Sequence, residues 1–338
     1  MALYVSHPSS HLHDTGPHPE NAGRLVAIEA AMEAREWLGV ERASAPAAPR
    51  EWIERVHAPE HVDAIEKFTR GGGGMIDHDT VASAESFEAA LRAAGGAAWA
   101  VERLLAGEHR AAFCGLRPPG HHAERARAMG FCLFNNVAVA SAHAIAECEA
   151  RRVLVLDWDV HHGNGTEEIF AASGDVVYVS IHQAPLYPGT GDASFTGVGE
   201  GEGRTVNLPV PPGAGPDDFL ALVQHVVAPL AREFRPGLLA ISAGYDAHRA
   251  DPLASCRLDE DAFADMTAAM RELGAELEAP VLGCLEGGYD PPALAASVLA
   301  TIEALDSERP VRDVDVGTAE PHRRRVAAAW PALASNAG

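Results

Sequence analysis

Residues 152–165 read RVLVLDWDVHHGNG: a short apolar run of Val and Leu, followed at once by aspartates, histidines and glycines. An apolar run of this length, bounded by polar and glycine residues, predicts a buried β-strand. Because ligands of α/β proteins bind at the carboxyl ends of strands, this strand is expected to deliver reactive side chains to a binding site.

Six further runs of this kind are spread along the chain, at residues 3–7, 111–116, 176–182, 205–210, 238–244 and 281–288. Ala-rich segments of helical period lie between them, at residues 85–107, 135–150, 217–234 and 259–278. Such alternation predicts an α/β fold of three αβα layers, with a mostly parallel sheet of about eight strands. We expect one catalytic domain over residues 1–338, a flexible surface loop at residues 70–74 (RGGGG), and a frayed end from about Ser335.

Composition narrows the classes of function. Apolar residues make up 47% of the chain and charged residues 22%, as in soluble globular proteins. The formal net charge is −22 and Lys67 is the single lysine, which argues against direct nucleic-acid binding. The sequence shows no membrane-spanning run, no signal peptide and no CxxC spacing among its five cysteines. These features predict a cytoplasmic protein with free thiols, and they leave a homo-oligomer open.

The end of the strand at 152–157 predicts a metal site. Asp157, Asp159 and His161 alternate and therefore point the same way. Burying carboxylates beside an imidazole is unfavourable unless a cation or hydrogen-bond partners compensate. Asp246, which follows the run at 238–244, is expected to meet Asp159 and His161 across adjacent strand ends. One histidine and two carboxylates leave an open position on zinc, which is typical of catalytic sites. A structural hydrogen-bonded cluster is the alternative.

Two adjacent histidines, His121 and His122, follow the run at 111–116. They are weak indicators alone, but Asp157 could orient His121 and Asn164 could orient His122 through ring N–H groups. One of the two histidines would then be placed as general base and later as general acid.

Tyr289 follows the run at 281–288, within EGGYD. A glycine turn with a half-buried tyrosine explains this segment without any chemistry. In this context, however, the hydroxyl could stabilise the oxyanion of a tetrahedral intermediate, which is often the largest contribution in acyl transfer.

Together these motifs resemble the zinc-dependent histone deacetylase family, particularly its class II members and the bacterial histone deacetylase-like amidohydrolases. The resemblance covers most of the chain. It runs through HDTGPHPENAGRL near His13, VHAPEHVDAIEKF, RPPGHHAERARAMGFCLFNN, DWDVHHGNGTEEIF, YVSIHQAPLYPGTG, SAGYDAHRADPL and EGGYD. It implies an arginase/deacetylase-like fold and the hydrolytic removal of an acetyl or other short acyl group from a lysine side chain or another primary amine.

The resemblance also implies a role for individual residues. It makes Asp159, His161 and Asp246 zinc ligands, although iron(II) could replace zinc, and it makes His122 the general base and Tyr289 the group that polarises the carbonyl. The implied substrate channel comprises Gly130, Phe131, Tyr187, Leu253, Gly287 and Gly288, with Arg24 at an inner cavity. Structural potassium would involve Asp157, Asp159, His161, Ser180 and Ile181, and at a second site Phe170, Ser173, Val176 and Arg204.

Some positions separate subgroups of that family. Asn164 stands where class I members carry aspartate. The asparagine at this position is a feature shared with class II. Tyr289 is retained where some class II relatives have histidine, which favours an active enzyme. Leu253 stands where polyamine-selective relatives carry a glutamate, which favours lysine over polyamines, although Asp79 or Glu124 could supply a carboxylate instead.

Three alternatives stay open at this point. The first is a deacetylase of acetylpolyamines or other small molecules with the same site. The second is an arginase-type ureohydrolase, although DWDVHH differs from the DxHxD spacing expected there. The third is a non-catalytic protein that binds acyl-lysine.

Overall fold

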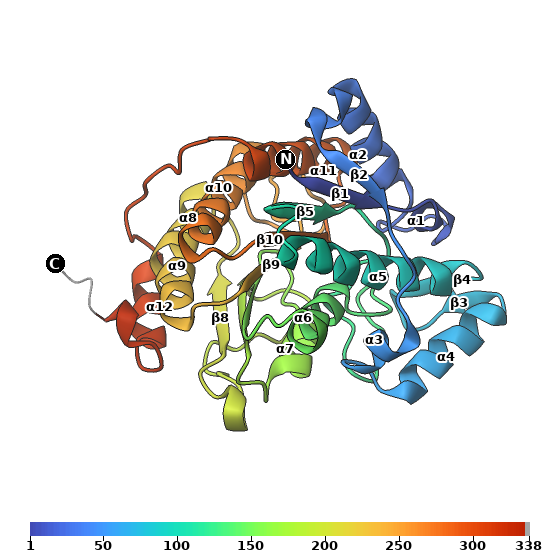
Figure 1. Ribbon diagram of the computed structural model, residues 1–338, viewed down its shortest axis with the longest axis horizontal. Coiled ribbons are helices and arrows are strands. Elements are labelled where there is room, and N and C mark those ends of the chain that lie inside the picture. Colours follow the sequence, from blue (N-terminus) through green and yellow to red (C-terminus); the bar gives the residue numbers. More distant parts are fainter. Residues whose placement is uncertain (335–338) are drawn as a thin grey trace.

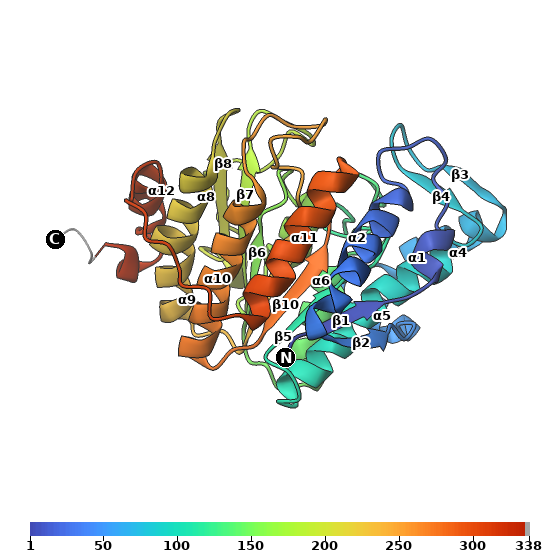
Figure 2. The ribbon, with the colours of Figure 1, turned by 90° about the horizontal axis from the view of Figure 1, so that it is seen from above.

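Eight strands form one sheet at the centre of the molecule, and helices cover both of its faces (Figure 1, Figure 2). The computed structural model describes residues 1–334, so the fraying expected from about Ser335 lies outside the described residues. All neighbouring strands of this sheet are parallel. In their order across the sheet the strands are β2 (Glu41–Ser44), β1 (Leu3–Ser6), β5 (Ala111–Cys114), β10 (Val281–Leu285), β9 (Leu238–Ala243), β6 (Val153–Asp157), β7 (Val176–Gln183) and β8 (Thr205–Val210). The predicted α/β fold is confirmed.

Seven of these strands coincide with the predicted apolar runs, because both faces of a parallel sheet are buried. On β6, Leu154 and Leu156 pack into the core on one face, and Val153 and Val155 pack into the core on the other. The seven runs therefore carry apolar residues at consecutive positions rather than at every second one.

Each face of the sheet has its own set of helices. On one face lie α2 (Gly23–Ala34), α8 (Pro216–Leu222), the π-helical turn η3 (Val223–Val227), α9 (Ala228–Phe234), α10 (Glu260–Leu277), α11 (Pro291–Asp306) and α12 (Ala319–Val326). On the other lie α3 (Arg50–Glu54), α4 (Pro59–Arg70), α5 (Ser86–Leu105), α6 (Asn136–Glu147) and α7 (Asn164–Phe170). The shorter elements are α1 (Ser9–Leu12), η1 (Glu36–Gly39), η2 (Gly199–Gly201) and η4 (Pro331–Leu333).

Within residues 1–334, no helix combines the length and the apolar character needed to cross a bilayer. The five cysteines all lie in this range, form no disulfide, and four of them are buried.

The structure corrects one expectation and adds three short strands that no apolar run predicted. Residues 70–74 do not form a single loop: Arg70 ends α4, and Gly73 begins a small antiparallel hairpin of β3 (Gly73–Met75) and β4 (Val81–Ser83). Strand β2 has the polar sequence ERAS and no apolar run predicted it. As an edge strand, β2 has only one neighbour and leaves most of its side chains exposed.

Four neighbouring strands, β5, β10, β9 and β6, stand side by side in the sheet. The predicted histidine pair follows β5, Tyr289 follows β10, Asp246 follows β9, and Asp159 and His161 follow β6. Because parallel strands end at the same edge, the sheet topology alone brings these loops together.

Candidate active site

The side chains predicted to bind metal meet beyond the ends of β6 and β9. Asp159, His161 and Asp246 each offer a ligand atom within 4.8 Å of the other two, and all three residues are buried. Nδ1 of His161 is 3.1 Å from Oδ1 of Asp159 and 3.0 Å from Oδ2 of Asp246. The backbone N–H of Gly287 donates to Oδ2 of Asp159, and that of Val160 donates to Oδ1 of Asp246, each at 2.8 Å. Nδ1 of His161, Oδ1 of Asp159 and Oδ2 of Asp246 are therefore left facing one another.

Burial makes the charges of this cluster interact strongly. Burial by itself would lower the pKa of His161, but hydrogen bonds to Asp159 and Asp246 outweigh it and raise the pKa to about 10. Burial, and then the charge of Asp159, raises the pKa of Asp246 to about 6. A cation is therefore favoured among these side chains, either as a proton on His161 or as a metal ion. One nitrogen and two carboxylate ligands fit zinc with an open fourth position.

Asp157 is the last residue of β6 and orients His121. Its Oδ2 is 3.0 Å from Nδ1 of His121 and accepts the hydroxyl hydrogen of Tyr178 at 2.9 Å. Burial by itself would lower the pKa of His121, but the charges of Asp157 and Asp159 hold that pKa well above its usual range. The charges around His121 therefore favour its imidazolium form.

His122 has a neutral partner. Its Nδ1 lies 2.8 Å from Oδ1 of Asn164, the first residue of α7. Burial, and then the charges of His121 and His161, hold the pKa of His122 well below its usual range. Of the two histidines, His122 is thus the one whose surroundings favour the neutral ring, which can accept a proton.

Tyr289 approaches His122 and His161 from the loop after β10, and all three line one cavity. Its backbone N–H donates to Oδ2 of Asp251 at 2.7 Å, and its ring centroid lies 5.1 Å from the Arg24 guanidinium carbon. Burial, and then the charge of Asp246, hold the pKa of the Tyr289 hydroxyl well above its usual range. The hydroxyl consequently keeps its hydrogen and can donate it to an oxyanion.

The cavity has a volume of about 220 Å³ and combines a polar end with apolar walls. The rings of Phe131 and Tyr289 meet edge-on at 5.8 Å, and those of His122 and Tyr187 at 5.2 Å. Four residues of the predicted channel line the cavity, together with Leu186, which the sequence did not suggest, and Asp79. The complete lining is Asp79, His122, Gly130, Phe131, His161, Leu186, Tyr187, Leu253 and Tyr289.

Three other residues predicted for the channel, Gly287, Gly288 and Arg24, are not part of this lining. Gly287 instead contacts Asp159 through its backbone N–H. Arg24 is 1% exposed, and its Nε donates to the carbonyl of Gly288 at 2.7 Å. Arg24 therefore holds the loop of Tyr289 in place without lining the cavity.

Glu286 received no role from the sequence, although the structure ties it to the histidine loop. Its Oε2 accepts the backbone N–H groups of Gly120 at 2.6 Å and His121 at 3.2 Å, and Oε1 accepts the Ser242 hydroxyl at 3.2 Å. Burial raises the pKa of Glu286 to about 7. The signal that could have revealed it is an acidic residue at the end of an otherwise apolar strand.

The residues ascribed to potassium lie around β7. Asp157 and Ser180 are register partners on β6 and β7. In the second set, the Phe170 carbonyl accepts the Ser173 N–H, and the Arg204 carbonyl accepts a backbone N–H from β7, each at 2.9 Å. Both potassium assignments stay predictions.

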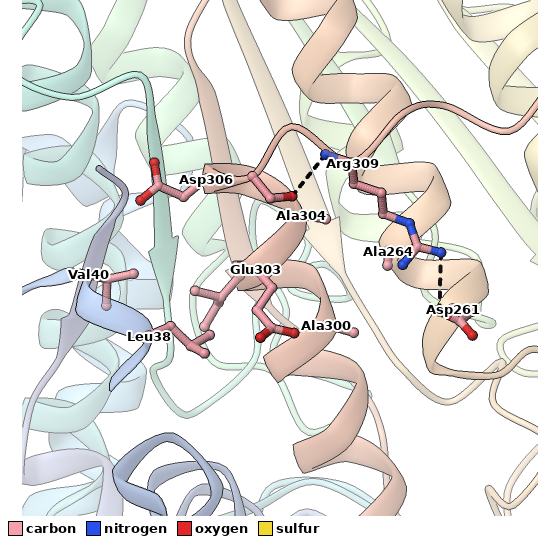
Figure 3. A pocket seen from close by; sticks show the side chains of 11 residues that line it. Leu38, Val40, Asp261, Ala264, Ala300, Glu303, Ala304, Asp306 and Arg309 are labelled. Carbon is pink, nitrogen blue, oxygen red and sulfur yellow. Dashed lines mark hydrogen bonds and ion pairs between the residues drawn. The ribbon is translucent and has the colours of Figure 1, made fainter. Parts of the chain in front are cut away.

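Other parts of the surface offer weaker candidates. A hollow of about 480 Å³ lies between η1 and the helices α10 and α11, where Figure 3 shows Arg309 reaching Asp261. Asp77, His78 and Asp79 form a second group with metal-ligating atoms, but the His78 side chain is 74% exposed. Neither place combines a buried Asp–His–Asp group with a second histidine and a tyrosine in one cavity, as the site at the strand ends does.

Comparisons with known proteins identify relatives over most of the chain. A sequence profile described as the histone deacetylase domain matches residues 18–305. The chain is 43% identical to a probable deacetylase of Methanothermobacter thermautotrophicus, over 90% of this chain and 91% of that protein. It is 37% identical to a histone deacetylase-like amidohydrolase of Pseudomonas aeruginosa, over 92% of this chain and 82% of the relative. The crystal structure of the HDA15 HD domain superposes with a TM-score of 0.91 at 37% identity, covering 98% of both chains.

Proposed function

The chain belongs to the histone deacetylase family, and from this premise we propose that it is a zinc-dependent amidohydrolase that removes acetyl or another short acyl group from a lysine side chain or a similar primary amine. The observation that carries the proposal is the meeting of His122, His161 and Tyr289 in one cavity of about 220 Å³. A cavity of this size, with apolar walls and a polar end, suits an extended alkyl chain that ends in an amide.

The metal would be held by Asp159, His161 and Asp246. Zinc bound there would polarise the amide carbonyl and lower the pKa of a water molecule. The backbone bonds from Gly287 and Val160 hold the two carboxylates in place before any substrate arrives. Such preorganisation makes the electrostatic contribution effective.

We assign separate roles in proton transfer and charge stabilisation to His122, Tyr289 and His121. Neutral His122 takes a proton from the attacking water, because its burial and the charge of His121 favour the unprotonated ring. The Tyr289 hydroxyl donates to the oxygen that becomes negative in the tetrahedral intermediate. A protonated histidine then passes its proton to the departing amine. His121, whose pKa the charges of Asp157 and Asp159 raise, adds positive charge next to the His122 ring, 4.0 Å away between ring centroids.

Two residues that line the cavity bear on the amine. Leu253 offers no charge to a second ammonium group and so favours a lysine side chain. Asp79 lines the same cavity with a carboxylate and favours a cationic small molecule such as an acetylpolyamine. The lysine substrate is our first proposal, and the polyamine is the second because of Asp79.

The test is a comparison of substrates with the zinc-loaded protein, whose metal content is measured first. We expect one zinc per chain and a higher kcat/KM on acetyl-lysine peptides than on acetylated putrescine or spermidine. The reverse order would favour the second proposal. Zinc-loaded protein that binds these ligands but cleaves no acyl chain length would contradict hydrolysis itself, and urea release from guanidino compounds would indicate an arginase-type enzyme.

A further inference from the structure

A chain of hydrogen bonds leads from His122 outwards to Glu124. Oδ1 of Asn164 is 2.8 Å from Nδ1 of His122, and Nδ2 of the same amide donates to Oε1 of Glu124 at 2.8 Å. The sulfur of Met129, 3.4 Å from Nδ2, is a second acceptor on that side. Asn164 is 6% exposed and Glu124 is half-buried.

The amide of Asn164 has two orientations of nearly equal shape, so its neighbours choose between them. In the orientation that the structure has, Nδ2 of Asn164 faces two hydrogen-bond acceptors, Glu124 and Met129. Turned by 180°, Oδ1 would face a carboxylate oxygen and a thioether, which cannot donate a hydrogen bond. The carboxylate of Glu124 therefore selects the orientation in which Oδ1 faces His122.

That orientation decides which ring nitrogen of His122 carries the hydrogen. Since Oδ1 of Asn164 only accepts, Nδ1 must be the donor, and Nε2 keeps its lone pair. With Nδ2 facing the ring, Nδ1 would have to accept, and the hydrogen would move to Nε2. Only the first tautomer leaves Nε2 of His122 free to take a proton from water.

We propose that Glu124 is a positioning residue of the reaction: by orienting the amide of Asn164 it sets the tautomer of His122. The inference rests on the proposed function, because it concerns the base of that reaction. An aspartate at position 164 would accept from Nδ1 in either orientation and would need no such partner. The asparagine is what makes the outer carboxylate necessary.

A double-mutant cycle between positions 124 and 164 tests this dependence. Glu124→Gln keeps the size of the side chain, but its amide can accept or donate, so Asn164 loses its preferred orientation. We expect kcat to fall about tenfold with KM changed less than about twofold. In the Asn164→Asp background, adding Glu124→Gln should leave kcat unchanged or raise it, because it removes a carboxylate placed 2.8 Å from residue 164.

Glu168→Gln is the matched control. The Glu168 carboxylate accepts the backbone N–H of Arg125 at 2.8 Å and so holds the same loop from its other side. We expect kcat of this variant to equal that of the wild type. A similar loss of kcat from Glu124→Gln in both backgrounds would reduce Glu124 to a general structural role. No loss in the Asn164 background would overturn the proposal directly.

A measurement without substrate separates this inference from the proposed function. In ¹⁵N-histidine-labelled, zinc-loaded protein, the His122 ring signals, identified by their disappearance in His122→Asn, should show the Nδ1–H tautomer. In Glu124→Gln they should shift towards the Nε2–H tautomer. Inactive wild-type protein would contradict the proposed function alone, whereas an unchanged tautomer in Glu124→Gln would contradict the role of Glu124 alone.

Discussion

Gly287 shows at the scale of single atoms how closely the backbone approaches the proposed metal ligands Asp159 and Asp246. A Cβ atom at this position would stand 2.1 Å from Oδ2 of Asp246 and 2.6 Å from Oδ2 of Asp159. Neither oxygen can move without changing the position of a proposed ligand. The glycine is therefore part of the proposed metal site, although it supplies only a backbone N–H.

We predict that Gly287→Ala weakens zinc binding by about 10-fold or more, because the added methyl group displaces both carboxylates. Competition with a chromogenic chelator measures the affinity. Gly215→Ala is a suitable control, since its Cβ would meet nothing within 4 Å. Equal zinc affinities for Gly287→Ala and the wild type would show that the cluster is looser than the structure indicates.

The proposed mechanism uses the hydroxyl group of Tyr289 as a hydrogen-bond donor, and removing that group alone tests this role. Tyr289→Phe should retain its zinc and lose deacylase activity by about 100-fold or more, if the hydroxyl acts as other oxyanion donors do. Most of the loss should appear in kcat, because the ring that lines the cavity remains. Turnover equal to the wild type would remove Tyr289 from the mechanism.

Much of the site could be predicted from residue types and their distance from a strand end. Asp159, His161 and Asp246 were assigned in this way, and the structure brings them together. The bonds made by Glu286 and Glu124 were not foreseeable by this route. Each depends on how two loops from separate parts of the chain lie against each other, and no local pattern records that.

At the scale of secondary-structure elements, the start of α11 links helix stability to the site. Oδ1 of Asp290 accepts the N–H of Ala293 at 2.9 Å and caps the helix directly after Tyr289. Asp259 caps α10 in the same manner, with Oδ1 accepting the N–H of Ala262 at 3.1 Å. The two caps are alike in chemistry but differ in their distance along the chain from Tyr289.

We predict that Asp290→Ala and Asp259→Ala each destabilise the protein by about 1 kcal/mol, the usual contribution of an N-cap. Thermal melting of both variants measures this. Only Asp290→Ala should also lower kcat, because fraying of the first turn of α11 moves Tyr289. Equal kcat values for the two variants would mean that the Tyr289 loop holds its place without the helix.

Apolar runs located seven strands, but other elements depended on context that a run does not contain. The edge strand β2 buries too little surface to require apolar residues. The segment 217–234, expected as one helix, contains the wider turn η3, which ends two residues before Pro229. Proline lacks an N–H and its ring clashes with the preceding turn of an α-helix, so the wider turn accommodates it.

At the scale of the whole molecule, His57 makes stability depend on pH. Its Nε2 accepts the backbone N–H of Asn135 and its Nδ1 donates to the carbonyl of Glu124, both at 2.9 Å. Burial, and then the charge of His61, lowers the pKa of His57 to about 3. The neutral ring thus joins α6 to the segment after α3 and to the histidine loop.

Because the folded pKa of His57 lies below the unfolded value of about 6.5, its contribution is complete above that pH and is lost as the pH falls towards 3. We predict that the wild type loses about 2 kcal/mol from this group between pH 7.5 and pH 5. His57→Gln should be less stable at pH 7.5 but should change less over this interval. Urea unfolding at the two pH values measures the difference, and parallel pH dependences would exclude His57 as the cause.

The place of β10 in the sheet affects the order in which a newly made chain can assemble its sheet and the loops of the site. β10 is the last strand within residues 1–334, yet it pairs with β5 on one side and β9 on the other. Until residues 281–285 are synthesised, the strands can form only two separate groups, β2–β1–β5 and β9–β6–β7–β8. Asp159, His161 and Asp246 all follow strands of the second group, whereas the histidine pair follows the first. A chain still under synthesis can therefore bring the proposed ligands Asp159, His161 and Asp246 together before β10 arrives, whereas Gly287 and Tyr289 join them only after β10 has been made.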